Sequence, residues 1–238
     1  MNNMLLVIGL ALVLNPLLWL YNYRIAPPGA ELAILPVLAA LVVAFIIGEG
    51  VGRMACLSFG CCYGKPLSRL GPRQQRLLAP FACVYAGENK KNAYADNLAG
   101  VPVVPIQLLT SLLYVNVGLL AFSLFLFGYF GAAFALAAIF SLGWRVISEQ
   151  FRADYRGGGK FSAYQLVNLF NIVFCLFLLQ WLPASPDAAV RLGEGAAALW
   201  HPGVLLFLQL IWILLLLYFG ISRVTGVRME FNVRWERI

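Results

Sequence analysis

The stretch ELAILPVLAALVVAFII, residues Glu31–Ile47, sets the fold class of this 238-residue chain. It has no charged side chain after its first residue, and it approaches the ~20 apolar residues that cross the hydrocarbon core of a bilayer as a helix. It also lacks the strict alternation of polar and apolar residues that a barrel strand shows. We therefore predict a transmembrane helix here.

Further stretches of the chain have the same character and predict more transmembrane helices. They are Met4–Tyr21, Pro105–Tyr129, Gly131–Ile147, Tyr164–Leu182 and Gly203–Ile221. The sequence thus predicts an all-α polytopic membrane protein with about six transmembrane helices, folded as a single membrane domain over residues 1–238. We interpret the first stretch as a retained helix, because it lacks the basic start of a signal peptide and Asn15–Pro16 interrupts it.

The composition supports the same class. Hydrophobic residues make up 62% of the chain and charged residues 11%, and the mean hydropathy is +0.83. Soluble domains contain about 45–50% apolar and about 25% charged residues. These values exclude a soluble enzyme, a disordered chain and a nucleic-acid-binding domain, and they leave an integral membrane protein.

The basic residues sort unevenly between the loops. Of the 17 Lys and Arg, all but four lie after the second, fourth and sixth predicted spans, on the face that these loops share. The opposite face holds Arg24 and Arg191, while Arg53 and Arg145 lie at span ends. The positive-inside rule therefore predicts that the basic face and both termini are cytoplasmic.

Glycine and cysteine crowd the region after the second span. Gly48/Gly52 and Gly60/Gly64 are GxxxG pairs, which let helices pack closely in lipid. We also expect a broken, non-helical segment from Cys56 to Gly64, which membrane depth tolerates only inside protein or beside a wet cavity.

Ionisable residues in or beside the spans are few: Glu49, Arg53, Arg145 and Glu149. Charges at membrane depth are costly and by default mark function. Arg145, Glu149, Arg152 and Arg156 recur at helical spacing, which predicts one helical stripe with Glu149 paired to Arg145 or Arg152. The stripe is either a structural ion pair with snorkelling arginines or an anion site. A phospholipid phosphate is the obvious anion.

Three of the five cysteines, Cys56, Cys61 and Cys62, lie close together in the sequence. Their spacing is not the usual C-x-x-C of a metal site, and the one histidine, His201, is distant. We expect packed, reduced thiols, with no metal and no cofactor.

Four motifs in order carry a family resemblance. They are GRMACLSFGCCYGKP (Gly52–Pro66), VPIQLL (Val104–Leu109), GWRVISEQFRADYR (Gly143–Arg156) and FSAYQLVNL (Phe161–Leu169). Together they cover roughly residues 40–180 and resemble the signature segments of the prolipoprotein diacylglyceryl transferase family.

The resemblance implies a membrane-embedded transferase of the bacterial inner membrane. Such enzymes move a diacylglyceryl group from phosphatidylglycerol to a lipoprotein cysteine and release glycerol phosphate. The implied catalytic residues are Arg53, Arg145 and Glu149. The implied substrate-binding residues are Arg53, Gly60, Tyr63, Gly64, Gln107, Arg145, Arg152 and Gln165. The implied partners are an anionic phospholipid and a lipoprotein or other acceptor, with no nucleic acid.

The chain departs from the family pattern in two respects. It has no histidine before Arg53, where the family carries a His-Gly-Gly loop, so Glu49, Glu149 and Tyr63 all stay open as the base. The resemblance also implies a periplasmic site, whereas the basic loops predict a cytoplasmic one. A divergent paralogue with another acceptor and a non-catalytic phospholipid-binding protein are the alternatives.

Overall fold

We describe residues 14, 16–27, 31–87, 90–153, 162–182 and 190–221 of a computed structural model of the chain. Four helices in these ranges are long and apolar enough to cross a membrane, and a fifth candidate is a helix pair bent by 68°. The prediction of an all-α polytopic membrane protein is confirmed. Residues 16–24 are helical, but residues 4–13 of the first predicted span lie outside the described ranges.

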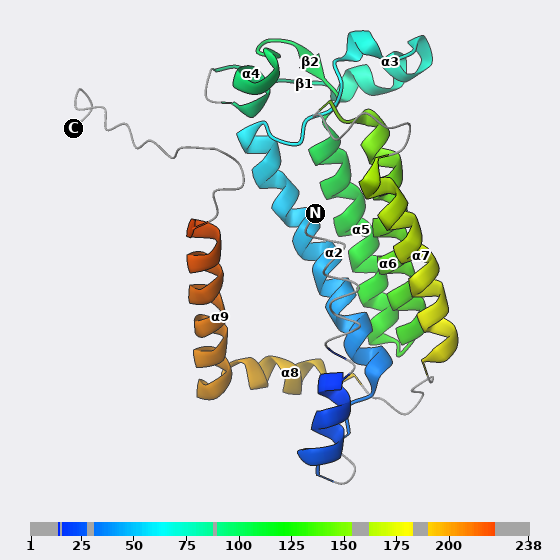
Figure 1. The fold of residues 1–238 in the computed structure, drawn as a ribbon, viewed down its shortest axis with the longest axis vertical. Helices are drawn as coiled ribbons and strands as arrows, with labels where there is room; N and C mark the ends of the chain where they lie inside the picture. Colours follow the sequence, from blue (N-terminus) through cyan, green and yellow to red (C-terminus); the bar gives the residue numbers. More distant parts are fainter. Residues whose placement is uncertain are drawn as a thin grey trace, which may run out of the picture. The chain divides into compact units, whose positions relative to one another are not determined.

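The four long helices form a bundle (Figure 1). They are α2 (Ile34–Phe59), α5 (Ile106–Leu126), α6 (Phe130–Ser148) and α7 (Ala163–Trp181). Helix α6 packs against the other three. Its buried face carries Ala133, Ala137 and Ala138, whose small side chains let the backbones approach closely. Many large apolar side chains on the outer faces are exposed, as expected where a helix meets lipid rather than water.

Helix α2 is longer than the sequence predicted. It continues past Ile47 to Phe59, so the non-helical segment begins at Gly60 and not at Cys56. The interpretation of Gly48 and Gly52 as a packing pair is wrong, because a Cβ at either position would meet nothing within 4 Å in the described structure. The close approach is at Gly50, where a Cβ would lie 3.0 Å from the Cβ of Tyr114 on α5.

Residues 60–87 and 90–105 form a small cap at one end of the bundle (Figure 1). The cap contains η1 (Leu67–Arg69), α3 (Pro72–Leu78), η2 (Ala79–Phe81), β1 (Cys83–Val84), α4 (Lys91–Asp96) and β2 (Pro102–Val103). Strands β1 and β2 pair antiparallel, with Cys83 opposite Val103. Tyr63, Tyr85 and Val103 are the buried core of the cap. The cap therefore has a hydrophobic centre of its own beside the membrane bundle.

The predicted stripe from Arg145 to Arg156 is wrong beyond the end of α6. The helix stops at Ser148, and η3 (Glu149–Phe151) is a single 3-10 turn. Arg152 is extended and forms an isolated bridge with Gly64, while the Lys65 N–H donates to the Phe151 carbonyl at 2.7 Å. These bonds to the cap replace the helical ones, and Arg156 lies outside the described ranges.

The chain divides into two compact units, and the second begins at Arg191. Its described part holds α8 (Leu192–Leu199) and α9 (Pro202–Ile221), which make up the bent pair. Helix α9 matches the predicted span Gly203–Ile221 within one residue.

Candidate functional site

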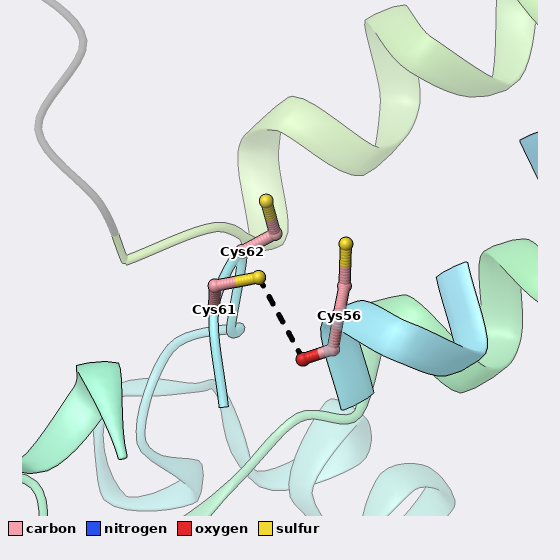
Figure 2. A group of neighbouring side chains, drawn as sticks. All are labelled: Cys56, Cys61 and Cys62. Carbon is pink, nitrogen blue, oxygen red and sulfur yellow. Dashed lines mark hydrogen bonds between the residues drawn. The ribbon is translucent and has the colours of Figure 1, made fainter. Parts of the chain in front are cut away.

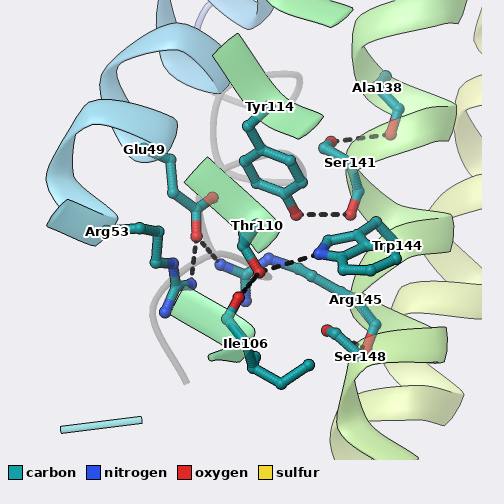
Figure 3. A network of polar contacts seen from close by, with 10 residues as sticks. All are labelled: Glu49, Arg53, Ile106, Thr110, Tyr114, Ala138, Ser141, Trp144, Arg145 and Ser148. Carbon is teal, nitrogen blue, oxygen red and sulfur yellow. Dashed lines mark hydrogen bonds and ion pairs between the residues drawn. The ribbon is translucent and has the colours of Figure 1, made fainter. Parts of the chain in front are cut away.

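Two arginines from different helices meet at one carboxylate (Figure 3). Arg53 donates from Nη2 to Glu49 Oε1 at 2.5 Å, one turn away on α2, and Arg145 on α6 donates to the same oxygen. The Arg53, Arg145 and Glu49 side chains are 17%, 24% and 11% exposed. A guanidinium has five N–H groups, so one bond to Glu49 leaves donors for a second anion. We call these three residues the arginine clamp.

A polar network holds α6 beside α5 next to the clamp (Figure 3). The Tyr114 hydroxyl donates to the Ser141 carbonyl at 2.8 Å, and the Trp144 indole donates to the Thr110 hydroxyl at 2.9 Å. Tyr114 is fully buried, and its hydroxyl also neighbours the Arg145 guanidinium. These bonds fix the turn of α6 that carries Arg145 and so position the clamp.

We call residues 60–64, which lie in the first of the four motifs, the signature loop. Its first and last residues are glycines that the backbone conformation requires. Gly60 ends α2 with a left-handed φ of 65°, and its N–H caps the Cys56 and Leu57 carbonyls. Gly64 lies against β2, and a Cβ there would be 2.5 Å from the Val104 carbonyl oxygen. Only glycine fits these two positions without strain or displacement of a neighbour. Both residues therefore shape the loop and lie apart from the clamp's own contacts.

Tyr63 and Gln107 tie the signature loop to the cap and the bundle. The buried Tyr63 hydroxyl donates to the Asp96 carboxylate at the end of α4. The Gln107 amide, at the start of α5, donates to the Cys61 carbonyl at 2.6 Å. The structure therefore brings Gln107 to the loop and Tyr63 to the end of α4.

Gln165 begins α7 as part of a capping box. Its side chain accepts from the Ser162 N–H at 3.0 Å, and the Ser162 hydroxyl accepts from the Gln165 N–H at 3.2 Å. Its amide also donates to the Val146 carbonyl of α6 at 3.1 Å. The described bonds of Gln165 thus join α7 to the helix that carries Arg145.

The thiols of Cys56, Cys61 and Cys62 gather at the end of α2 (Figure 2). Their sulfur atoms all lie within 4.8 Å of one another, and all three residues are partly exposed. Hydrogen bonding to the Cys56 and Cys61 thiols, together with the Arg152 guanidinium, lowers the pKa of Cys62 below its usual range. The cluster therefore favours a thiolate at Cys62.

The comparisons with known proteins agree with the family resemblance. The family model described as prolipoprotein diacylglyceryl transferase matches residues 7–181. The chain belongs to this family. A similar curated protein of the transferase family is the phosphatidylglycerol–prolipoprotein diacylglyceryl transferase of Clostridium tetani (strain Massachusetts / E88), 30% identical over 152 residues. That match covers 61% of this chain and 53% of the relative, so the chain spans about half of the relative's length. No solved structure matches the chain.

Sequence reasoning missed several contacts of this transferase-family site. The spacing of Glu49 and Arg53 is i,i+4, which indicates their ion pair, yet we weighed Glu49 only as a base. Nothing in one sequence joins Glu49 to Arg145, 96 positions away, or Tyr63 to Asp96. The sequence predicted packed, reduced thiols at Cys56, Cys61 and Cys62, but the approach of their sulfur atoms to within 4.8 Å depends on the turn after Gly60.

Proposed function

We propose that the arginine clamp binds the phosphate of phosphatidylglycerol and that the protein transfers the diacylglyceryl group to a thiol acceptor. The observation that carries this proposal is the convergence of Arg53 and Arg145 on one carboxylate oxygen. Two guanidiniums that meet at an oxyanion are arranged to hold a phosphodiester as well. Family membership supplies the reaction class.

The charges of the clamp fit this chemistry. Arg53, Arg145 and Glu49 together carry +1, so a bound phosphodiester makes the group neutral, which low-dielectric surroundings favour. As the carbon–oxygen bond breaks, the phosphate gains a second negative charge. The arginines then stabilise the departing glycerol phosphate, and the loss of one such donor typically slows an enzyme ~10²–10³-fold.

The transfer step is a displacement at carbon. The acceptor's thiolate sulfur forms a bond to the terminal glyceryl carbon of the lipid, and the bond between that carbon and the phosphate oxygen breaks. Its electron pair leaves with glycerol phosphate, and the product is a thioether. A lipoprotein cysteine is the acceptor by family default.

The three candidate bases have different surroundings. One Glu49 oxygen accepts from both guanidiniums, so we assign Glu49 to positioning the arginines. The Tyr63 hydroxyl is committed to Asp96. We propose Glu149, in the turn that follows the helix of Arg145, as the carboxylate that accepts the thiol proton.

The test uses the full chain in vesicles of the bacterial inner membrane, which is the membrane that we propose for it. The vesicles contain headgroup-labelled phosphatidylglycerol. We expect wild type to release labelled glycerol phosphate, and Arg53→Ala and Arg145→Ala to release almost none while keeping their helical content. Arg191→Ala is the matched control, because Arg191 forms an exposed ion pair with Glu194. Release of glycerol phosphate at the wild-type rate by either clamp variant would rule out the clamp as the phosphate site. Lipid binding without release would favour the alternative of a non-catalytic phospholipid-binding protein.

A further inference from the structure

Three thiols from one turn and one loop face the same space (Figure 2). Cys56 lies in the last turn of α2, and Cys61 and Cys62 follow the helix end at Gly60. All three are free and partly exposed, and their sulfur atoms lie within 4.8 Å of one another. This is the one such group of potential metal ligands found in the described ranges.

The backbone is bent to make this arrangement. After the left-handed turn at Gly60, the Cys61 N–H donates to the Cys56 carbonyl at 3.1 Å. Cys62 adopts a φ of 56°, which is uncommon for a residue with a side chain and is found mostly at functional or closely constrained positions. Gln107 holds the Cys61 carbonyl from α5. The loop is therefore fixed from both sides with its thiols turned back toward α2.

The surroundings of the cluster are positively charged. The Arg152 guanidinium lies beside the Cys62 thiol, and the Arg53 guanidinium interacts electrostatically with both Cys56 and Cys62. The same Arg53 belongs to the arginine clamp, so the thiols and the clamp are electrostatic neighbours.

We propose that Cys56, Cys61 and Cys62 bind one zinc ion through their three sulfur atoms and leave its fourth position open to the thiol of the acceptor. Three sulfurs at about 2.3 Å from a tetrahedral zinc lie about 3.8 Å from one another, so small side-chain rotations complete the site. Catalytic zinc sites have three protein ligands and one open position, whereas structural sites have four.

The role of the open position rests on the proposed function. A thiol that binds zinc loses its proton, which leaves to water directly or through Glu149. The zinc-bound sulfur then attacks the glyceryl carbon, and glycerol phosphate departs from the clamp with the electron pair of the broken carbon–oxygen bond. The ion thus activates the acceptor thiol, which the transfer step requires.

The first experiment measures metal content. The full chain is purified in detergent under reducing conditions, loaded with zinc and analysed for bound metal. A second sample is loaded with cobalt, because charge-transfer absorption from thiolate to cobalt shows that the ligands are sulfur atoms. We expect one ion per chain in wild type and in Cys83→Ser, a partly exposed cysteine outside the cluster. We expect Cys61→Ser and Cys62→Ser to bind at least ~10-fold more weakly. Equal binding by these variants, or a metal-free protein with a Cys56 disulfide, would overturn the proposal.

The second experiment separates this proposal from the proposed function. A peptide with one cysteine is added to the cobalt-loaded protein in the absence of lipid, with a serine peptide as control. A shift of the charge-transfer band with the cysteine peptide alone supports the open position, even if glycerol phosphate release then fails. No shift with either peptide would overturn the thiol-binding role, whatever the result with lipid.

Discussion

The Arg145 side chain on α6 and the Glu49 side chain on α2 form an ion pair between positions 96 residues apart. The pair joins two neighbouring helices of the bundle and places a second guanidinium beside Arg53. It therefore serves both the packing of the helices and the geometry of the proposed phosphate site, and both roles can be tested.

The first prediction concerns the shape of the cation. Arg53→Lys and Arg145→Lys keep the charge but lose the planar fork that binds two phosphate oxygens at once. We expect each to retain lipid binding and to slow glycerol phosphate release at least ~10-fold, because one directed donor is lost where charge develops. The measurement is turnover at saturating lipid. Unchanged turnover in both lysine variants would show that charge alone suffices.

The second prediction concerns the energy of the ion pair. Glu49→Gln leaves two partly buried guanidiniums without their shared carboxylate, so we expect a lower melting temperature in detergent. In a cycle of Glu49→Gln, Arg145→Gln and the double variant, we expect a coupling of at least ~0.5 kcal/mol, as for residues in direct contact. Additive effects would mean that the pair contributes nothing to stability.

The third prediction compares two glycines. Gly64→Ala places a Cβ 2.5 Å from the Val104 carbonyl oxygen, so the signature loop must shift and both stability and transfer should fall. Gly48→Ala, with nothing within 4 Å, should be neutral or stabilising by ~0.5–1 kcal/mol, because alanine is the better helix former. Melting temperature and transfer rate are measured for both. A tolerated Gly64→Ala would contradict the close packing of the loop against Val104.

The fourth prediction concerns the membrane face of the cap. The basic loops predict a cytoplasmic cap by the positive-inside rule, whereas the family resemblance implies a periplasmic site. Alkaline phosphatase inserted after Gly100, in the exposed turn before β2, should be inactive if the charge rule holds. Full activity of the inserted enzyme would place the cap in the periplasm.

The long helices of the described ranges were predicted from the sequence, because apolar runs of membrane length are typical of transmembrane helices. The wrong predictions lie where tertiary contacts override local pattern. Helix α2 continues through its glycines to Phe59 and does not end at Ile47. Backbone bonds between the cap and the segment after α6 take Arg152 out of the helical stripe. The sequence singled out Arg53 and Arg145 as costly membrane charges, but only the structure shows that Arg145 shares Glu49 with Arg53.

The most direct test of the account follows the lipid itself. Phosphatidylglycerol labelled in its diacylglyceryl part is incubated with the full chain and a peptide that carries one lipobox cysteine, and the peptide is examined by mass spectrometry. We predict a thioether-linked diacylglyceryl group on the cysteine, with equimolar glycerol phosphate, and no product with Arg53→Ala. Label that stays in phospholipid, or appears only as free diacylglycerol, would contradict this prediction.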